Sequence, residues 1–556
     1  MQSPISMIPE DVLVSIFELA TKQSSGMALT LAHVSPLWRT IAHAYATLWT
    51  TITVSNTFYT CLRGSHHPAT SEYALGPRPH DIHQPDLLNL RHYLYYSKDR
   101  LLDVRVDAEM PHLLARRDEE LAMNNVRYHG RTTRIALLLA RHTKRIRSLS
   151  VQCDSYYTFI HFFDTIKSIT AHEEWGSLEH LDVQWHGPID RFTSMDPCLR
   201  NRLPFGMLED RLMATSADRP EYPLPGPTSG FEHLRFLTLG GTNIDWDTFA
   251  PTNLQELHLL EMNDDIKPTY EQLRWVLLRN AATLIKLSLV DVFTSFDGGN
   301  GVDSDTFILP CVHTLKLGYA LPEDLDSLIF SLVLPAMRSL MVINTGEKLY
   351  ETSFKGEMTH HARDHYEATQ YLLGSLARAW DLTNIECVKL VDVRCIFQNS
   401  TLPEEPSNWN LSHAQEIFDR GYHLARPRVQ KDRDAFLVWG PMKFWHACTR
   451  LRTVSLVRPD AATLYSLCCP VPEEPPYAPK SRGVERHTKI GSFSDDRSWI
   501  HSPEGPSLRL PCPRLRTIKL KVSQVDDSVV NGFIDRRNFF VGCTKRGVKA
   551  EYIISE

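Results

Sequence analysis

Aliphatic and polar residues alternate with helical periodicity at the start of the chain. One apolar stripe at this spacing comprises Val12, Leu13, Ile16, Phe17 and Ala20. Pro9 suits the first turn of such a helix because the N–H that it lacks has no partner there, and Glu10 and Asp11 favour the positive end of the helix dipole. The pattern predicts a helix that begins at this proline and packs its stripe on another part of the protein.

Two further short helices are predicted before residue 46. After a polar, glycine-containing break at 22–26, the next apolar group is Ala28, Leu29, Leu31 and Ala32. Ser35 suits an N-cap and Pro36 the first residue of a third helix, because a serine hydroxyl accepts from the free N–H groups of a first turn. The stripe of that helix comprises Leu37, Ile41, Ala44 and Tyr45.

Such a small helical unit has a marginal core, because fewer than about 60 residues bury little surface on their own. Part of its apolar surface must therefore face something else. We expect that an external partner covers it. The alternative is a simple N-terminal cap on the end of a larger domain.

The periodicity changes to that of strands after residue 47. Residues 48–54 alternate, are rich in β-branched side chains and predict a strand. Residues 55–100 are expected to be a connecting segment with several prolines and a helix around 87–94, and 101–106 predicts a second strand.

Ten further segments share the pattern L-x-x-L-x-L, in which L is an aliphatic residue or Met. They are 146–151, 178–183, 234–239, 254–259, 284–289, 312–317, 337–342, 385–390, 451–456 and 515–520. Chance alone gives about nine such segments at this length and composition, so the count carries little weight. The spacing is more informative, because Leu237, Leu257, Leu287, Leu315 and Leu340 are 20, 30, 28 and 25 residues apart. Periods of about 20 to 29 residues are typical of leucine-rich repeats.

Two motifs near the start of the chain resemble the F-box in its fungal form. The opening motif is Ile8-Pro9-Glu10-Asp11-Val12-Leu13, the closing motif is Val34-Ser35-Pro36-Leu37-Trp38-Arg39, and Leu48-Trp49 matches the usual exit. In that family the module docks on the Skp-type adaptor, and through it on the cullin, of a ubiquitin ligase. The resemblance implies adaptor contacts by Ile8, Pro9, Val12, Leu13, Ile16, Val34, Leu37 and Trp38.

The region behind these motifs resembles the leucine-rich region that follows many fungal F-box modules, although the asparagine of regular repeats is missing. The resemblance implies an α/β protein with a three-helix F-box at 1–54, a connecting segment at 55–100 and an irregular leucine-rich-repeat-like solenoid at 101–556. Polar, proline-rich insertions near 188–230, 400–441 and 470–513 are expected to be exposed.

The positions between the repeated aliphatic residues are candidates for binding a target protein. They face away from the core, on the concave side of such a solenoid. In the early copies they include His180, Asp182, Glu256 and His258, and in the later copies Lys286, Lys316, Lys389, Lys519 and Lys521. The basic half would suit an acidic segment or a phosphorylated motif. The equal alternative to target binding is that these lysines merely keep the strands soluble.

The charge, the apolar runs and the cysteine spacing of the chain indicate which classes of partner and which cellular locations to expect. The 556 residues carry a formal net charge of −6, which does not suggest nucleic acid binding. No run of eighteen apolar residues and no basic-then-apolar leader is present, so we expect no membrane contact and a location in the cytoplasm, the nucleus or both. The eleven cysteines include no C-x-x-C pair and are expected to be reduced thiols.

No catalytic motif is evident. Phosphate-binding loops, dinucleotide fingerprints, H-E-x-x-H and G-x-S-x-G are all absent from the sequence. His361 and His365 could share a metal on one helix face, and the acidic loop at 297–305 has calcium-like residues, but neither matches a complete ligand pattern. We therefore expect no enzyme activity, no cofactor and no metal site. The expected function is that of a substrate-recognition subunit of a Skp-cullin-F-box ubiquitin ligase, and the alternatives are a leucine-rich-repeat scaffold without a ligase link and a divergent enzyme.

Overall fold

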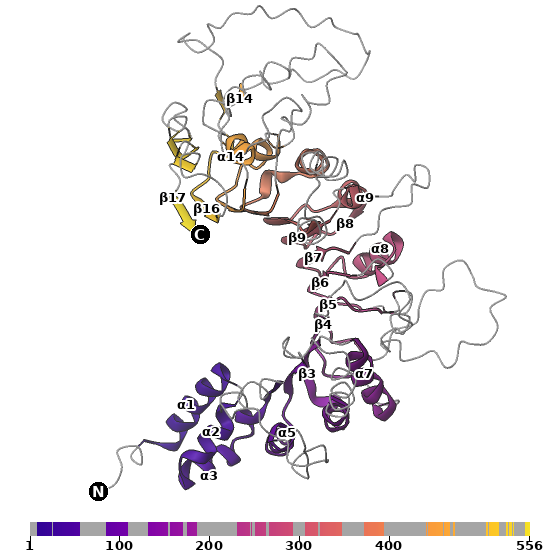
Figure 1. The fold of residues 1–556 in the computed structure, drawn as a ribbon, viewed down its shortest axis with the longest axis vertical. Coiled ribbons are helices and arrows are strands. Elements are labelled where there is room, and N and C mark those ends of the chain that lie inside the picture. The colour runs from indigo at the N-terminus through magenta and orange to yellow at the C-terminus, as the bar shows by residue number, and fades with distance from the viewer. Residues whose placement is uncertain are drawn as a thin grey trace, which may run out of the picture. The chain divides into compact units, whose positions relative to one another are not determined.

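The structure is a computed structural model that describes residues 8–55, 85–108, 132–185, 231–292, 306–346, 372–393, 441–472 and 508–555, with gaps inside several of these ranges. The chain forms two compact units, Met1–Thr294 and Ser295–Glu556. Both units are built from parallel strands with helices between them, so the protein is a mixed α/β protein dominated by parallel sheet (Figure 1).

Three helices open the first unit, as the sequence predicts. They are α1 (Glu10–Gln23), α2 (Met27–Val34) and α3 (Pro36–Ala44). Pro9 is the N-cap of α1, so the helix begins one position after the predicted start at this proline. Ser35 caps α3 through its Oγ, which accepts a hydrogen bond from the Trp38 N–H at 3.2 Å, and Pro36 is the first helical residue. The predicted capping of the third helix is therefore confirmed.

The sheet of the first unit begins directly behind these helices. A 3-10 turn, η2 (Ala46–Trp49), occupies the start of the predicted strand, and β1 (Thr51–Ser55) follows it. The other elements are α5 (Pro85–Tyr96), β2 (Leu102–Ala108), η5 (Thr143–Arg145), β3 (Ile146–Cys153), α7 (Tyr156–Thr170), β4 (His180–Trp185), β5 (Phe236–Gly240), β6 (Glu256–Leu260), α8 (Tyr270–Arg279) and β7 (Lys286–Val290). Strands β1 to β7 pair in sequence order, and every pair is parallel.

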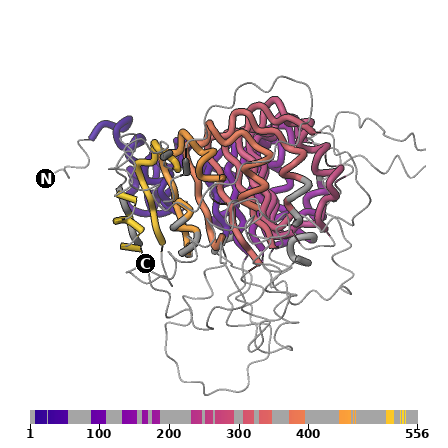
Figure 2. The backbone as a smooth tube through the Cα atoms, turned by 90° about the horizontal axis from the view of Figure 1, so that it is seen from above, coloured from indigo at the N-terminus to yellow at the C-terminus, as the bar shows by residue number. Residues whose placement is uncertain are grey.

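The second unit repeats this plan. Its elements are β8 (Phe307–Ile308), β9 (Thr314–Tyr319), α9 (Glu323–Ser331), β10 (Leu332–Val333), β11 (Ser339–Asn344), η10 (Leu382–Asn384), β12 (Cys387–Val391), β13 (Thr453–Val457), α14 (Ala461–Ser466), β14 (Val471–Pro472), β15 (Leu508–Arg509), β16 (Thr517–Lys521) and β17 (Glu551–Ser555). Strands β9, β11, β12, β13, β16 and β17 form a parallel sheet in that order. Figure 2 traces the backbone of this unit in colours that run from pink at its start to yellow at the C-terminus.

All ten L-x-x-L-x-L segments coincide with strands, which confirms this prediction. The first aliphatic residue lies two positions before its strand in nine of the ten segments, and in the other, Ile146, it begins β3. The three aliphatic residues of every copy are 2% exposed or less. Strand register aligns equivalent positions, so that Leu237, Leu257 and Leu287 lie side by side in the core. Successive side chains of a strand point to opposite faces of the sheet. The residues between these aliphatic positions therefore lie on the opposite, outer face of each sheet.

The backbone geometry at the strand ends also repeats. Several strands are followed by a residue with positive φ, namely Gly241, Glu261, Asp291, Asp392 and Arg458. In four of them, Gly241, Glu261, Asp392 and Arg458, the N–H donates to the last carbonyl of the next strand, for example from Glu261 to Val290 at 2.7 Å. A Cβ on Gly241 would lie 2.8 Å from the Trp185 ring, so that turn requires glycine.

The predicted insertions fall largely beyond the described residues. This holds for 188–230 and for 400–441 apart from position 441. The ends of the third insertion are described, and they pair antiparallel, with Val471 opposite Arg509 and Pro472 opposite Leu508. Near the C-terminus, Val530 and Phe533 are buried.

Candidate docking surfaces

The helical module at 8–49 exposes large aliphatic side chains. Val12, Ile16, Val34 and Leu37 are between 43% and 56% exposed. Leu19, which is not among the residues predicted to contact the adaptor, is 63% exposed. Val12, Ile16 and Leu19 follow one another at i, i+4 and i+7, so they share one face of α1. We call these three side chains the α1 face.

The remaining residues that the resemblance assigns to adaptor contact differ in accessibility. Pro9 is exposed, whereas Ile8 and Trp38 are half-buried. Leu13 is only 3% exposed and belongs to the core of the module, together with Phe17 one turn later. Phe17 packs on the Trp38 ring at 4.8 Å between centroids. The single stripe that the sequence suggested is thus two adjoining stripes, and the inner one that contains Leu13 is not open to a partner.

The inner side of the module packs on the rest of the first unit through aromatic rings. Trp49 is fully buried, its indole N–H donates to the Ala42 carbonyl at 2.6 Å, and its ring meets Tyr93 at 5.1 Å. The His43 ring stacks on Tyr96 at 4.1 Å. Burial raises the pKa of Tyr93 to about 12. Tyr93 and Tyr96 belong to α5, so this helix joins the module to the sheet.

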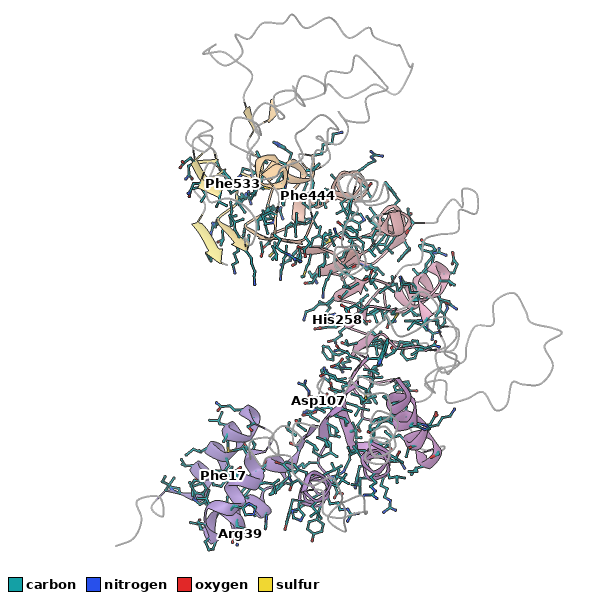
Figure 3. All side chains as sticks on the ribbon, viewed as in Figure 1. Phe17, Arg39, Asp107, His258, Phe444 and Phe533 are labelled. Carbon is teal, nitrogen blue, oxygen red and sulfur yellow. The ribbon has the colours of Figure 1, made fainter. Side chains whose placement is uncertain are left out.

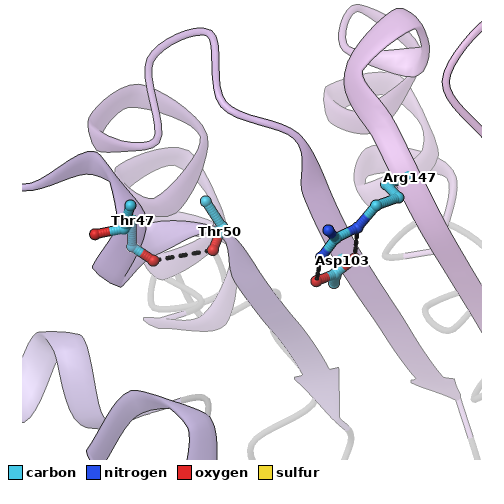
Figure 4. A network of polar contacts seen from close by, with 4 residues as sticks. All are labelled: Thr47, Thr50, Asp103 and Arg147. Carbon is cyan, nitrogen blue, oxygen red and sulfur yellow. Dashed lines mark hydrogen bonds and ion pairs between the residues drawn. The ribbon is translucent and has the colours of Figure 1, made fainter. Parts of the chain in front are cut away.

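Polar side chains make contacts in the turn before β1 and between β2 and β3. Figure 4 shows Thr50, whose hydroxyl donates to the Thr47 carbonyl at 2.9 Å in the turn before β1. In the same view Arg147 of β3 donates two hydrogen bonds to the carboxylate of Asp103 on β2, from Nε to Oδ1 at 3.0 Å and from Nη2 to Oδ2 at 2.5 Å. A bidentate pair of this kind fixes the orientation of both side chains.

The outer face of the first sheet carries the predicted target-binding residues His180, Asp182, Glu256 and His258. Helices α7 and α8 lie on the other face, whereas Asp107 and His258 are on the side away from them (Figure 3). The His180 ring stacks on Phe236 at 4.0 Å, and burial lowers the pKa of this histidine.

The charges on this outer face are largely satisfied by one another. Glu256 Oε1 accepts from Lys286 Nζ at 2.6 Å, and Oε2 lies 3.4 Å from His258 Nε2. Burial opposes ionisation of Glu256, but the hydrogen bonds from Lys286 and His258 outweigh it and lower the pKa of this carboxyl. Asp182 accepts from Ser150 at 2.9 Å. Lys286 is therefore an ion-pair partner within the first unit, and it does not extend the basic half that the sequence suggested.

The remaining predicted lysines lie on the outer face of the second unit. Lys316 is on β9, Lys389 on β12, and Lys519 and Lys521 on β16. The strand register places Lys316, Lys389 and Lys519 at equivalent positions, whereas Lys521 is two residues further along its strand. We call Lys316, Lys389 and Lys519 the lysine row.

Other candidates from the sequence are not placed by the structure. His361, His365 and the acidic loop at 297–305 lie outside the described residues. Within the described part of the chain, no group of three or more His, Cys, Asp or Glu side chains is arranged to hold a metal ion. None of the helices described there is long and apolar enough to cross a membrane.

Comparison with known proteins found no similar family or protein. No protein-family model matches this chain, and no curated protein sequence matches it.

Proposed function

We propose that the protein is a non-enzymatic interaction protein with two separate docking surfaces, one on the helical module and one on the outer face of the repeat strands. More specifically, we propose that it is the substrate-recognition subunit of a Skp-cullin-F-box ubiquitin ligase. The helical module would bind the Skp-type adaptor and the strand face a target protein. Ubiquitin transfer would then belong to its partners, inside the cytoplasm, the nucleus or both.

The observation that carries this proposal is the α1 face. Val12, Ile16 and Leu19 expose adjoining aliphatic surface on one helix, and Val34 and Leu37 expose more at the junction of α2 and α3. Exposed aliphatic side chains that cluster in this way mark interaction sites. Their positions overlap those at which the resemblance to the F-box implies adaptor contact.

A purely capping role explains only half of the module. Its inner side, with Trp49 packed on Tyr93, does cover the start of the sheet as a cap would. A cap has no use for an apolar outer surface, however, because exposing aliphatic groups to water is unfavourable. The outward position of the α1 face therefore favours a docking function over a leucine-rich-repeat scaffold without a ligase link.

The proposal predicts that making the α1 face polar weakens adaptor binding. The variant Val12→Ser/Ile16→Ser/Leu19→Ser removes exposed side chains, so the fold should persist. We expect the affinity of the full chain for a purified Skp-type adaptor, measured by calorimetry, to fall about 30-fold or more, which is about 2 kcal/mol.

The matched control replaces exposed leucines on other helices. Leu137→Ser/Leu278→Ser changes side chains that are 44% and 42% exposed, and it should leave adaptor affinity unchanged. Equal affinity of the α1-face variant and the wild type, with the same melting temperature, would contradict the proposed docking site and favour the scaffold interpretation.

A further inference from the structure

A short sequence motif occurs twice in the second unit and places two arginines on each of two neighbouring turns. The copies are 448–456, Cys-Thr-Arg-Leu-Arg-Thr-Val-Ser-Leu, and 512–520, Cys-Pro-Arg-Leu-Arg-Thr-Ile-Lys-Leu. The first copy leads into β13 and the second into β16. These two strands pair in parallel with equivalent motif positions opposite each other, such as Thr453 and Thr517. The two turns therefore lie side by side, with their arginines in matching places.

The local packing of the motif leaves its arginines at the surface. The leucine between the two arginines of each copy, Leu451 or Leu515, is fully buried. The backbone also joins the copies, because the Arg516 N–H donates to the Arg452 carbonyl at 2.8 Å. The four exposed arginines are Arg450 and Arg452 in the first copy, and Arg514 and Arg516 in the second.

The arginines of the first copy show which groups this arrangement binds. Arg450 Nη1 donates to Asn384 Oδ1 at 3.1 Å, and Arg452 Nη1 lies 3.7 Å from Glu386 Oε2. Asn384 and Glu386 lie just before β12, which is the strand next to β13. The first two arginines are thus matched by two side-chain oxygen acceptors that are separated by one residue.

Arg514 and Arg516 repeat this arrangement one strand further along, and we call them the arginine pair. In the part of the chain that the structure describes, neither of their guanidinium groups has a hydrogen-bond or ion-pair partner. Strand β17 already pairs with β16, so a partner would contact these side chains without adding a strand. A guanidinium group binds a carboxylate through two parallel N–H bonds, which are stronger than bonds between neutral groups.

We propose that the arginine pair binds an acidic segment of a target protein in which two carboxylates are separated by one residue. This is the spacing of Asn384 and Glu386 opposite the first copy. An extended segment presents residues i and i+2 on one side, whereas a helix presents residues three or four apart. The segment is therefore bound in an extended conformation. The inference rests on the proposed function for the role of this segment as a target.

Two heptapeptides of identical composition test the spacing. The spaced peptide is Thr-Thr-Glu-Thr-Glu-Thr-Thr, and the adjacent peptide is Thr-Thr-Glu-Glu-Thr-Thr-Thr. Binding of each fluorescent peptide to the full chain is followed by anisotropy at low and at physiological ionic strength. We expect the spaced peptide to bind about fivefold more tightly, because only its carboxylates share one side when it is extended. Its binding should weaken with salt, since exposed charges are screened.

A matched pair of double variants tests the residues. Arg514→Gln/Arg516→Gln should weaken binding of the spaced peptide about tenfold, because both charge-assisted contacts are lost. The same change in the first copy, Arg450→Gln/Arg452→Gln, should weaken it only about twofold, because those arginines already have acceptors. Arg514→Lys/Arg516→Lys keeps the charge but removes the planar fork, so we expect an intermediate loss of about threefold. This variant remains informative if the Gln variant does not fold.

Three results would overturn the inference. They are equal affinity for the spaced and adjacent peptides, equal loss in the two Gln variants, and equal competition by a single-stranded oligothymidylate, which would indicate a general polyanion surface. Capture of a Skp-type adaptor by the same proteins separates this inference from the proposed function. If peptide binding follows the arginine pair while the wild type captures no adaptor, the proposed function is wrong and the arginine-pair site stands.

Discussion

At the residue scale, the junction between the helical module and the sheet depends on a titratable ring. His43 stacks on Tyr96 and lies 5.9 Å from the Trp49 ring, between centroids. Partial burial, together with the positive charge of Arg39 and the neighbouring His92, lowers the pKa of His43. The neutral imidazole is therefore the form that the folded junction favours.

This shift predicts how stability depends on pH. The unfolded chain binds a proton at His43 near pH 6.5, and the folded chain only at a lower pH, so stability is full above about pH 6.5 and declines as pH falls towards the folded pKa. His142 and His180 shift in the same direction. His43→Phe keeps a stacking ring and removes the titration, so denaturant midpoints between pH 7 and 5 should fall less steeply than in the wild type. An unchanged slope in this variant would contradict the role given to His43.

Some of these residue environments could be predicted from the sequence and others could not. The Ser35 cap and the burial of the L-x-x-L-x-L residues follow from local pattern. Leu13 looked equivalent to Val12 because one wide stripe contains both, and only the packing of Phe17 on Trp38 decides which side faces inward. The pairing of Lys286 with Glu256 joins residues 30 positions apart, so it depends on a strand register that no local pattern reveals.

At the scale of elements, the turns that end the strands are also linked by side chains. Asp392 and Arg458 both have positive φ and follow the neighbouring strands β12 and β13. Their side chains form an ion pair in which Asp392 is 5% and Arg458 34% exposed. The pair holds two successive turns in register, and loss of one partner would leave the other charge poorly compensated.

The Asp392→Asn variant tests this link, because asparagine tolerates positive φ and has nearly the same shape. We expect a loss of about 2 kcal/mol in the free energy of unfolding, below the range for fully buried pairs because Arg458 is partly exposed. The control, Glu386→Gln, removes an exposed pair with Arg452 and should cost less than about 1 kcal/mol. Equal effects of the two variants in urea unfolding would show that burial of Asp392 does not matter.

At the scale of the whole molecule, the two proposed surfaces belong to different compact units. The α1 face lies in Met1–Thr294 and the lysine row in Ser295–Glu556. The aliphatic pattern predicts one repeat region at 101–556 and does not mark the division after Thr294. The separation has a functional consequence, since changes at one surface should leave binding at the other intact.

Hydrogen exchange of the full chain with and without a purified Skp-type adaptor tests the central claim most directly. The account predicts that a complex forms and that amide exchange slows within 10–37, which includes α1 and the start of α3, while strands β9 to β16 keep their rates. Absence of a complex, or protection confined to the strands with none at α1, would contradict it.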